Sequence, residues 1–337
     1  MQSNTGMRFL IIGCGSIGKR HIDNLLTLNE KEIIAFDTSP DRRKEIQLHT
    51  GILVADTLID AWKFNPDVAF ITAPTSMHIQ LSLAAAEHKC HLFIEKPLSH
   101  RLEGIDDLLD IVQKENLITL VGCNMRFHPG LIMIKKLIDE GAIGNILAMR
   151  VEFGQYLPDW HPRENYRNGY SARSELGGGI ILDAIHEIDY IRWMLGEVDS
   201  VACTSGRLSK LDIDTEDTAA LLLRFSNGAI GEIHVDYIQR AYSRTCHVIG
   251  EEGTIRWDYT EGKVSWYSSC NKEWRSCYNP PGWEPNHMYV DELRHFLNCL
   301  NRNEYPCLDV FEAAHVLRIA IKAKKSAKEG EFVKIGK

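Results

Sequence analysis

Short apolar runs alternate with helical patterns through the first third of the chain. Runs rich in β-branched residues, such as Phe9–Ile12, Ile33–Phe36 and Val68–Thr72, predict strands that are buried on both faces. Leu92–Glu95 and Ile118–Gly122 continue the series. Strands that alternate with helices are typical of stacked βαβ units, so this third of the chain predicts a doubly wound parallel sheet.

The pattern changes after about Asn124. A long strand, Ile146–Phe153, and a helix over Ile180–Leu195 are followed by strands with little helix between them, which is typical of a mainly antiparallel sheet. We therefore predict a first domain with a doubly wound parallel sheet over residues 7–124 and a second α/β domain over 125–337. The later strands are expected at Ala219–Phe225, Ala229–Tyr237, Thr245–Ile249 and Thr254–Tyr259, with closing helices near His287–Leu300 and Val310–Lys328.

Composition narrows the class of protein. The 337 residues are 44% hydrophobic and 25% charged, as in ordinary globular proteins. A net charge of −8 excludes a general nucleic-acid or anionic-membrane binder, because such binding needs clustered Lys and Arg. No apolar run is long enough to span a bilayer, and MQSNTGMRFLIIG lacks the features of a secretory signal. Nine scattered cysteines without a CxxC pair predict no metal site, and we expect a cytoplasmic protein.

A glycine-rich segment, Gly13-Cys14-Gly15-Ser16-Ile17-Gly18, stands between a predicted strand and a predicted helix. The first glycine of GxGxxG permits a tight turn, the second lets the backbone approach a pyrophosphate, and the third lets the helix pack on the strand. The helix N-terminus then offers N–H groups to the phosphates. Asp37 ends the next strand, where a carboxylate would accept hydrogen bonds from ribose hydroxyls. The segment predicts dinucleotide binding; the alternative is a tight structural turn.

Asp37 also bears on the choice between NAD and NADP. A carboxylate at this place would repel a 2′-phosphate, which favours NAD. Arg42 and Arg43 follow closely and could receive that phosphate, or they could form a solvated helix face. We predict NAD.

Glu95-Lys96-Pro97 follows a predicted strand at the sheet edge where ligands bind in doubly wound folds. A lysine there could donate a hydrogen bond or act as acid or base, with its pKa lowered by burial or by a nicotinamide cation. Pro97 fixes the backbone and could be preceded by a cis peptide bond. The alternative is an exposed lysine that opens a loop.

A second polar segment follows three glycines, Gly177–Gly179. Asp183, His186 and Asp189 are spaced by three residues, which would place them near one stripe of a helix. His186 has the intrinsic pKa for proton exchange near neutrality, and a neighbouring carboxylate would orient it. The alternative is a core histidine that one of the two aspartates satisfies.

Taken in order, these motifs resemble the Gfo/Idh/MocA family of glucose–fructose oxidoreductase and inositol dehydrogenase relatives. The resemblance covers nearly the whole chain, because further segments also match. They are Thr72-Ala73-Pro74 with His78, Arg126-Phe127-His128-Pro129 with the helix that ends in LIDEGAIG, and the C-terminal AKEGEFV.

The resemblance implies a Rossmann domain followed by an α/β domain with a large, mainly antiparallel open sheet that often forms the interface of a homodimer or homotetramer. It implies that Lys96 contacts both nicotinamide and the reacting oxygen, and that Asp183 and His186 complete the catalytic set. The reaction would be oxidation of a secondary alcohol of a sugar or inositol, or its reverse. The implied cofactor contacts are Gly13, Gly15, Ser16, Ile17, Gly18, Asp37, Thr72, Pro74, His78, Glu95 and Lys96.

One spacing departs from the family pattern. The family more often has the aspartate four residues before the histidine, whereas three separate Asp183 from His186. On a continuous helix this moves Asp183 by about 100°. Its role is therefore less well defined than that of Lys96.

The loop Gln155–Arg173 is rich in aromatic and basic residues. Aromatic rings suit the apolar faces of sugars, and arginines suit carboxylates or phosphates, so the loop favours an acidic or nucleotide-linked sugar. The alternative is a loop held by its own aromatic and ionic contacts. The residues concerned are Tyr156, Trp160, Arg163, Tyr166, Arg167, Tyr170 and Arg173, and the expected substrate contacts are Arg126, Trp160, Tyr166, Arg173, Asp183 and His186.

Two further interpretations of the same fold stay open. One is a regulatory protein that binds the dinucleotide without turnover, as relatives that resemble galactose-pathway repressors do. The other is a different reaction, such as reduction of a conjugated or imine substrate or NAD-assisted glycoside cleavage. The four tryptophans within Trp257–Trp283 predict a sheet edge or a subunit contact.

Overall fold

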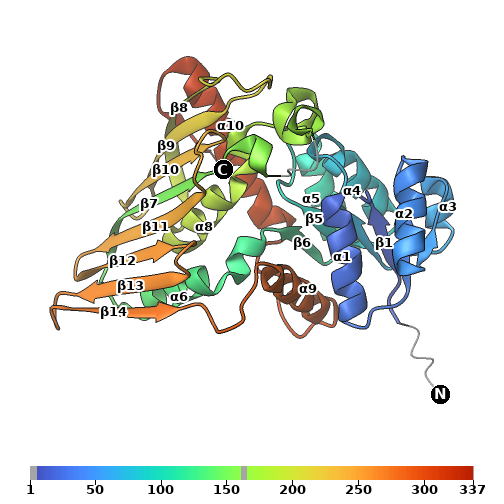
Figure 1. Ribbon diagram of the computed structural model, residues 1–337, viewed down its shortest axis with the longest axis horizontal. Helices are drawn as coiled ribbons and strands as arrows, with labels where there is room; N and C mark the ends of the chain where they lie inside the picture. Colours follow the sequence, from blue (N-terminus) through green and yellow to red (C-terminus); the bar gives the residue numbers. More distant parts are fainter. Residues whose placement is uncertain (1–5, 161–164, 337) are drawn as a thin grey trace. The chain divides into compact units, whose positions relative to one another are not determined.

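The computed structural model describes residues 6–160 and 165–336, and these form two compact units (Figure 1). The first unit holds the residues up to Asn124 together with Pro285–Ala314, and the second holds Met125–Glu284 and the residues from His315 onward. The sequence pattern had placed all of 125–337 in one domain; the segment Pro285–Ala314 instead groups with the first unit. No helix among the described residues is long and apolar enough to cross a membrane.

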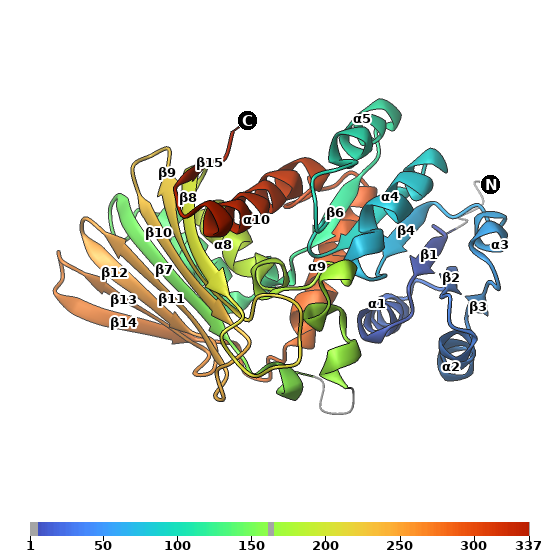
Figure 2. The ribbon, with the colours of Figure 1, turned by 90° about the horizontal axis from the view of Figure 1, so that it is seen from above.

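The first unit is built on a parallel six-stranded sheet. Its strand order, β3-β2-β1-β4-β5-β6, is the doubly wound order of dinucleotide-binding folds. Helices α4 and α5 lie together on one face, and α1 and α9 lie together on the other (Figure 2). The strands are β1 (Phe9–Ile12), β2 (Ile33–Phe36), β3 (Leu53–Val54), β4 (Val68–Ile71), β5 (His91–Glu95) and β6 (Thr119–Gly122), and the helices are α1 (Ser16–Thr27), α2 (Pro40–Thr50), α3 (Leu58–Trp62), α4 (His78–Glu87), α5 (Ile105–Glu115) and α9 (Asn286–Leu300).

The strand order reverses between β1 and β4. Strand β1 pairs with both β2 and β4, so that Ile12 lies beside Phe36 on one side and Ile71 on the other. The residues that follow these strands, among them Gly13 and Thr72, therefore meet at one edge of the sheet. In open α/β sheets, this edge at the point of reversal is where ligands bind.

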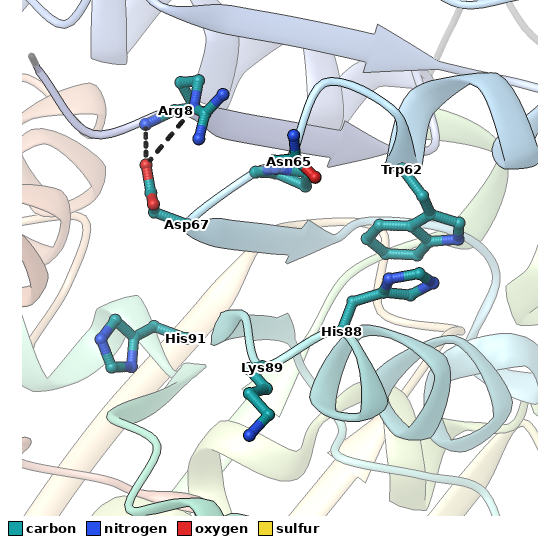
Figure 3. Close-up of a pocket in the computed structure, with 8 residues that line it drawn as sticks. Arg8, Trp62, Asn65, Asp67, His88, Lys89 and His91 are labelled. Carbon is teal, nitrogen blue, oxygen red and sulfur yellow. Dashed lines mark hydrogen bonds and ion pairs between the residues drawn. The ribbon is translucent and has the colours of Figure 1, made fainter.

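The opposite edge, at the amino ends of the strands, carries a polar pocket of about 320 Å³ (Figure 3). Asp67 accepts a hydrogen bond from the backbone N–H of Arg8, and the rings of Trp62 and His88 stack 4.4 Å apart. The first contact joins the amino ends of the neighbouring strands β1 and β4, and the second joins the ends of α3 and α4. The pocket is therefore at the end of the sheet away from the glycine-rich turn.

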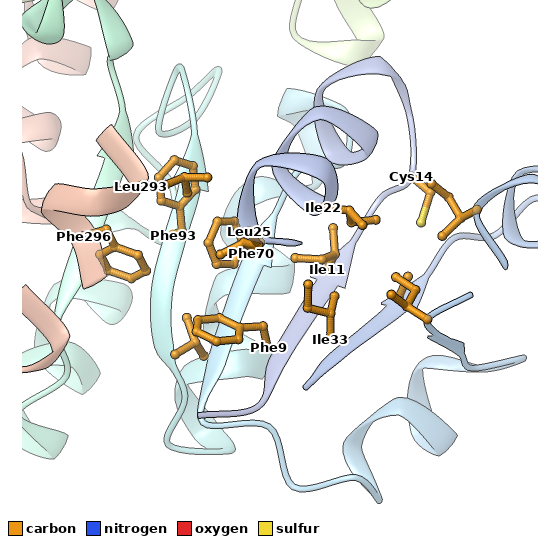
Figure 4. Packing of buried hydrophobic residues seen from close by; sticks show 14 of the residues in the cluster. Phe9, Ile11, Cys14, Ile22, Leu25, Ile33, Phe70, Phe93, Leu293 and Phe296 are labelled. Atoms are coloured by element: carbon orange, nitrogen blue, oxygen red, sulfur yellow. The ribbon is translucent and has the colours of Figure 1, made fainter. Parts of the chain in front are cut away.

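Helix α9 belongs to the first unit because aromatic residues hold it there. Phe70 and Phe93, on neighbouring strands, stack with their centroids 4.7 Å apart, and Phe296 of α9 meets Phe93 edge to face at 5.6 Å (Figure 4). Ile22 of α1 and Leu293 of α9 complete this buried cluster. Aromatic contacts of this kind stabilise a core beyond the area that they bury, so a segment distant in sequence completes the nucleotide-binding unit.

The second unit is built on a nine-stranded, mainly antiparallel sheet in the order β14-β13-β12-β11-β7-β10-β9-β8-β15. Strand β9 alternates buried and outward residues, so one face forms a core and α8 packs against it (Figure 2). The predicted fold class is therefore confirmed for both sheets. The elements are α6 (Pro129–Asp139), β7 (Ile146–Gly154), α7 (Ile180–Asp183), α8 (Ile185–Leu195), β8 (Val198–Gly206), β9 (Thr218–Phe225), β10 (Ile230–Asp236), β11 (Ser243–Gly250), β12 (Gly253–Asp258), β13 (Lys263–Ser268), β14 (Glu273–Tyr278), α10 (Val310–Glu329) from His315 onward, and β15 (Val333–Lys334).

Two of the clustered tryptophans lie at an edge of this sheet, one of the two placements predicted for them. Trp266 is on β13, and Trp274 is on β14, the terminal strand. Strand β14 is exposed along most of its length and shows no alternation of polar and apolar residues. That absence explains why the sequence pattern did not predict this hairpin.

His128 caps α6 inside an aromatic cluster of the second unit. Its Nδ1 accepts a hydrogen bond from the backbone N–H of Gly130 at 3.0 Å, and its ring lies against Trp257, Tyr259 and Trp283. The side chain is fully buried. Burial, with a smaller contribution from the Arg244 cation, lowers the pKa of His128 to about 3.

This depressed pKa predicts a loss of stability in mild acid. Between pH 6.5 and about 3, the unfolded chain binds a proton at His128 that the folded chain does not, so the free energy of unfolding falls as the pH falls. In His128→Asn, the amide oxygen can keep the cap while the titration is removed. We expect the stability difference between pH 8 and pH 5 to shrink by about 2 kcal/mol, measured by urea unfolding at both pH values. An unchanged difference would contradict the assignment.

Candidate active site

The GxGxxG turn has the shape that a pyrophosphate requires. Gly13 has φ +106°, and a Cβ there would lie 2.7 Å from the backbone of Thr72; a Cβ on Gly18 would lie 2.0 Å from the Gly13 carbonyl oxygen. Nothing lies within 4 Å of a Cβ on Gly15, which begins α1 without a side-chain cap. Gly13 and Gly18 therefore allow close backbone packing. Gly15 leaves open space before the N-terminal N–H groups of α1. These residues fit a dinucleotide.

Asp37 is held in place by two backbone groups. The N–H groups of Cys14 and Ser39 each donate to one carboxylate oxygen at 2.8 Å, and the side chain is buried. Each oxygen retains a second lone pair, so the carboxylate can still accept hydrogen bonds from ribose hydroxyls. The carboxylate and burial also raise the pKa of the Cys14 thiol to about 12, burial being the larger cause, which keeps that thiol protonated.

The two arginines after Asp37 differ in their contacts. Arg43 donates to the carbonyl oxygens of Asp37 at 2.8 Å and Thr38 at 3.3 Å, and its side chain is mostly buried. Arg42 is more than half exposed and lies 3.6 Å from the Asp37 carboxylate. Arg43 thus braces the turn, and Arg42 is the better placed of the two to reach a bound nucleotide.

Lys96 follows β5 at the same edge of the first unit as the GxGxxG turn, and its side chain is partly exposed. The peptide bond between Lys96 and Pro97 is cis, as the sequence allowed. The backbone N–H of Lys96 donates to Glu95 Oε2 at 3.2 Å, and Glu95 Oε1 lies 2.7 Å from His21 Nε2. His21 was not among the residues singled out from the sequence, although it lies on α1 three residues after the last glycine of the GxGxxG turn.

His78 is buried and contacts two backbone carbonyls. Its Nδ1 lies 2.8 Å from the Pro97 oxygen, and its Nε2 lies 2.9 Å from the Ala73 oxygen. Burial lowers the pKa of His78, and the two carbonyls act in the opposite direction. The sequence predicted a cofactor contact for this residue; its ring contacts the loops that follow β4 and β5.

The predicted helix over Ile180–Leu195 is wrong at one residue. Ala184, with φ −87° and ψ 32°, separates α7 from α8. Asp183 is therefore the last residue of α7, and His186 lies in the first turn of α8. The stripe expected from a spacing of three residues does not continue across this break, so the family spacing does not translate into an angle around one helix.

Asp183 lies among hydroxyl groups of the second unit. Ser171 Oγ donates to Oδ2 at 2.6 Å, Tyr237 Oη donates to the same oxygen at 2.9 Å, and the Tyr170 hydroxyl donates to Oδ1. Burial, and then the Asp183 charge, raise the pKa of Tyr237 well above its usual range, which keeps that phenol a donor. The carboxylate thus fastens the loop at Tyr170–Ser171 to α7.

His186 is buried near the start of α8, and Asp189 lies one turn further on. Asp189 accepts two hydrogen bonds from Arg126, from Nε at 2.9 Å and from Nη2 at 2.7 Å. Both side chains are buried, and the Arg126 guanidinium also lies over the Trp193 ring at 5.4 Å. The structure thus places Arg126, a predicted substrate contact, in a buried bidentate ion pair.

The loop before the glycine run makes many contacts within its own unit. Trp160 Nε1 donates to the Gln155 oxygen at 3.1 Å, and Arg173 Nε donates to the Arg167 oxygen at 2.9 Å. Tyr166 Oη accepts from the N–H of Asp212, whose carboxylate pairs with Arg167 at 3.0 Å. Arg163 lies outside the described residues. The described part of the loop is therefore held by polar contacts within itself and with Asp212.

The comparisons with known proteins agree with this geometry. Residues 7–123 match the family described as "Oxidoreductase family, NAD-binding Rossmann fold". Residues 131–256 match the family described as "GFO/IDH/MocA C-terminal domain". The chain belongs to the Gfo/Idh/MocA family. It is an NAD-binding oxidoreductase, as the order of its motifs predicted.

Members of the Gfo/Idh/MocA family match over about three quarters of the chain or more, and one matches over almost all of it. Myo-inositol 2-dehydrogenase of Thermotoga maritima is 29% identical over 98% of this chain and 98% of its own. Inositol 2-dehydrogenase 3 of Saccharopolyspora erythraea is 30% identical over 74% and 72%. Among solved structures, levoglucosan dehydrogenase in complex with NADH and levoglucosan superposes with a TM-score of 0.88 at 22% identity, covering 98% and 99% of the chains. That likeness shows that the two chains share the fold.

Proposed function

We propose that this protein oxidises a secondary alcohol of a sugar-like or cyclitol substrate to a ketone, or catalyses the reverse, with NAD as cofactor. The observation that carries the proposal is the place of Lys96: it follows β5 at the sheet edge that holds the GxGxxG turn and Asp37. Relatives named as inositol and levoglucosan dehydrogenases support the class of substrate.

In the proposed reaction, bound NAD supplies the acceptor for the hydride that leaves the carbinol carbon. His186 takes the hydroxyl proton, and Lys96 Nζ donates a hydrogen bond to the reacting oxygen. The alcohol thus loses a hydride and a proton and becomes a ketone. Asp183 acts by orienting the loop at Tyr170–Ser171 beside α7, through two hydroxyl contacts there and a third from Tyr237 after β10.

Within this class we favour an uncharged polyol over an acidic sugar. The acidic alternative depended on arginines in and near the loop 155–173. Arg126 is paired with Asp189, and Arg167 is paired with Asp212. The Arg126–Asp189 pair is buried, so Arg126 would lose a contact at a considerable cost in free energy before it could bind a substrate anion. The Arg167–Asp212 pair is exposed, so the cost there is small.

We also infer a cytoplasmic homo-oligomer, a dimer or tetramer. The scattered cysteines, with no CxxC pair, suit a reducing compartment. The outward face of the nine-stranded sheet carries exposed Leu222 and Ile230, 48% and 51% exposed, on neighbouring strands. A second copy packed on this face would bury both side chains.

A substrate screen tests the proposal. Purified protein with NAD is mixed with myo-inositol, scyllo-inositol, levoglucosan, glucuronic acid or a nucleotide-linked uronic acid, and NADH is followed at 340 nm. We expect turnover of at least one uncharged polyol. If no probe is turned over although NADH raises the melting temperature, the regulatory interpretation is favoured; glycoside cleavage would release sugar without net NADH. If NADH neither binds nor raises the melting temperature, the proposal fails.

A further inference from the structure

Two buried histidines each contact one of the two residues that flank Lys96 in the sequence. On one side, His21 Nε2 lies 2.7 Å from Glu95 Oε1, and the second oxygen of that carboxylate accepts the Lys96 backbone N–H. On the other side, His78 Nδ1 lies 2.8 Å from the carbonyl oxygen of Pro97. Both imidazole rings are fully or almost fully buried. The residues before and after Lys96 are thus each fixed by an imidazole that belongs to another element.

The two histidines come from the segments that frame the nucleotide site. His21 is on α1, the helix that begins at the GxGxxG turn. His78 is the first residue of α4, and its second ring nitrogen contacts the carbonyl oxygen of Ala73, in the loop after β4. Through these contacts, the turn that carries Lys96 is joined to both neighbouring segments at the carboxyl edge of the sheet.

The surroundings of His21 leave its contact with Glu95 little freedom. Its ring centroid lies 4.8 Å from that of Phe93 and 5.6 Å from that of Phe70. A Cβ on Gly122 would lie 3.2 Å from Glu95 Oε1, so the backbone of β6 closes the carboxylate in from another side. A buried polar pair contributes little net stability compared with apolar packing, but it fixes direction where apolar contacts would not.

We propose that His21 and His78 are positioning residues that hold the Glu95–Pro97 turn so that the Lys96 ammonium keeps one placement at the reacting oxygen. The inference rests on the proposed function, because it assumes that Lys96 contacts the reacting group. Neither histidine takes part in proton transfer. They act through the backbone and the Glu95 carboxylate, since a displacement of about 1 Å at a catalytic group can cost about a hundredfold in rate.

Substitution of each histidine by glutamine or asparagine tests its hydrogen bonds one at a time. Glutamine reproduces the reach of the imidazole Nε2, and asparagine that of Nδ1. His21→Gln keeps a donor toward Glu95, whereas His21→Leu removes it. His78→Asn keeps the contact with Pro97 and gives up Ala73, whereas His78→Gln does the reverse. His91→Leu is the matched control, because His91 Nδ1 accepts a backbone hydrogen bond from Ile118 at the opposite end of the same strand.

Lys96 itself provides a measurement that does not depend on turnover. The rate at which acetic anhydride modifies the Lys96 amine, relative to other lysines, is followed by peptide mass spectrometry from pH 7 to 11 in the protein without cofactor. We expect His21→Leu and His78→Gln to shift this profile and to lower kcat by about tenfold or more with little change in KM. His21→Gln, His78→Asn and the His91 control should stay within about threefold of the unsubstituted protein.

One outcome overturns the proposal. If His21→Leu and His78→Gln lower the melting temperature but leave the Lys96 labelling profile and kcat as in the His91 control, the histidines only pack the core. The labelling arm also separates this inference from the proposed function. If Lys96→Ala is fully active, the catalytic role of Lys96 fails, while the labelling profiles still show whether the two histidines place its amine.

Discussion

Replacing Lys96 with alanine is expected to lower kcat by at least about a hundredfold, because one donor to the reacting oxygen contributes about 10²- to 10⁴-fold in comparable acid–base sites. Lys96 follows β5 and is partly exposed, so the fold should be retained. The measurement is NADH formation at saturating NAD with the best substrate of the screen. NADH affinity, measured by fluorescence, should change far less than kcat.

Lys114→Ala is a suitable control, because Lys114 is an exposed lysine in the last turn of α5 in the same unit. It should behave like the unsubstituted protein. Full activity of Lys96→Ala would remove the residue from the chemistry and would favour a reaction driven by His186. A loss of activity that follows a loss of NADH binding would assign Lys96 to the cofactor alone.

Replacing Arg126 with methionine is expected to lower the free energy of unfolding by about 3–5 kcal/mol, because the Asp189 carboxylate would stay buried without its partner. Both side chains are less than a tenth exposed, and two hydrogen bonds join them. Denaturant unfolding, followed by circular dichroism, measures the effect. We expect this loss of stability to be among the largest that a single buried substitution causes in the second unit.

A double variant, Arg126→Met with Asp189→Leu, separates the ion pair from packing. It should recover most of the lost stability, since an apolar pair of similar volume can replace a buried ion pair. A double variant as unstable as the single one would show that the ion pair is not the cause. The KM of the double variant then tests whether Arg126 contacts the substrate. If the double variant regains its stability but has a raised KM, Arg126 is assigned as a substrate contact.

The sequence predicted the elements whose pattern is strong. The alternation of β9 predicts a strand by itself, and the short apolar run Val68–Ile71 predicts a buried strand once its length and its β-branched and aromatic residues are considered. The association of α9 with the first unit could not be predicted in this way. Its Phe296 meets Phe93 across a large separation in sequence, and periodicity carries no information on such a contact.

The features of the candidate site also fall into two groups, those that local sequence predicts and those that depend on tertiary contacts. The glycine turn and Lys96 stand at fixed offsets from predicted strands, so local sequence was enough to find them. The break at Ala184 arises from a single residue between two helical segments, and no glycine or proline marks it. The pairing of Arg126 with Asp189 and of His21 with Glu95 depends on which elements lie side by side, and a single sequence does not record that.

The return of Pro285–Ala314 to the first unit has a consequence for evolution and for engineering. The nucleotide-binding unit is discontinuous, and its aromatic core is complete only when α9 is present. An exchange of cofactor-binding units between relatives must therefore transfer two separate stretches of gene together. Recombination at a single junction near residue 124 would join a sheet to a helix selected for another partner, which limits how freely such enzymes can be shuffled.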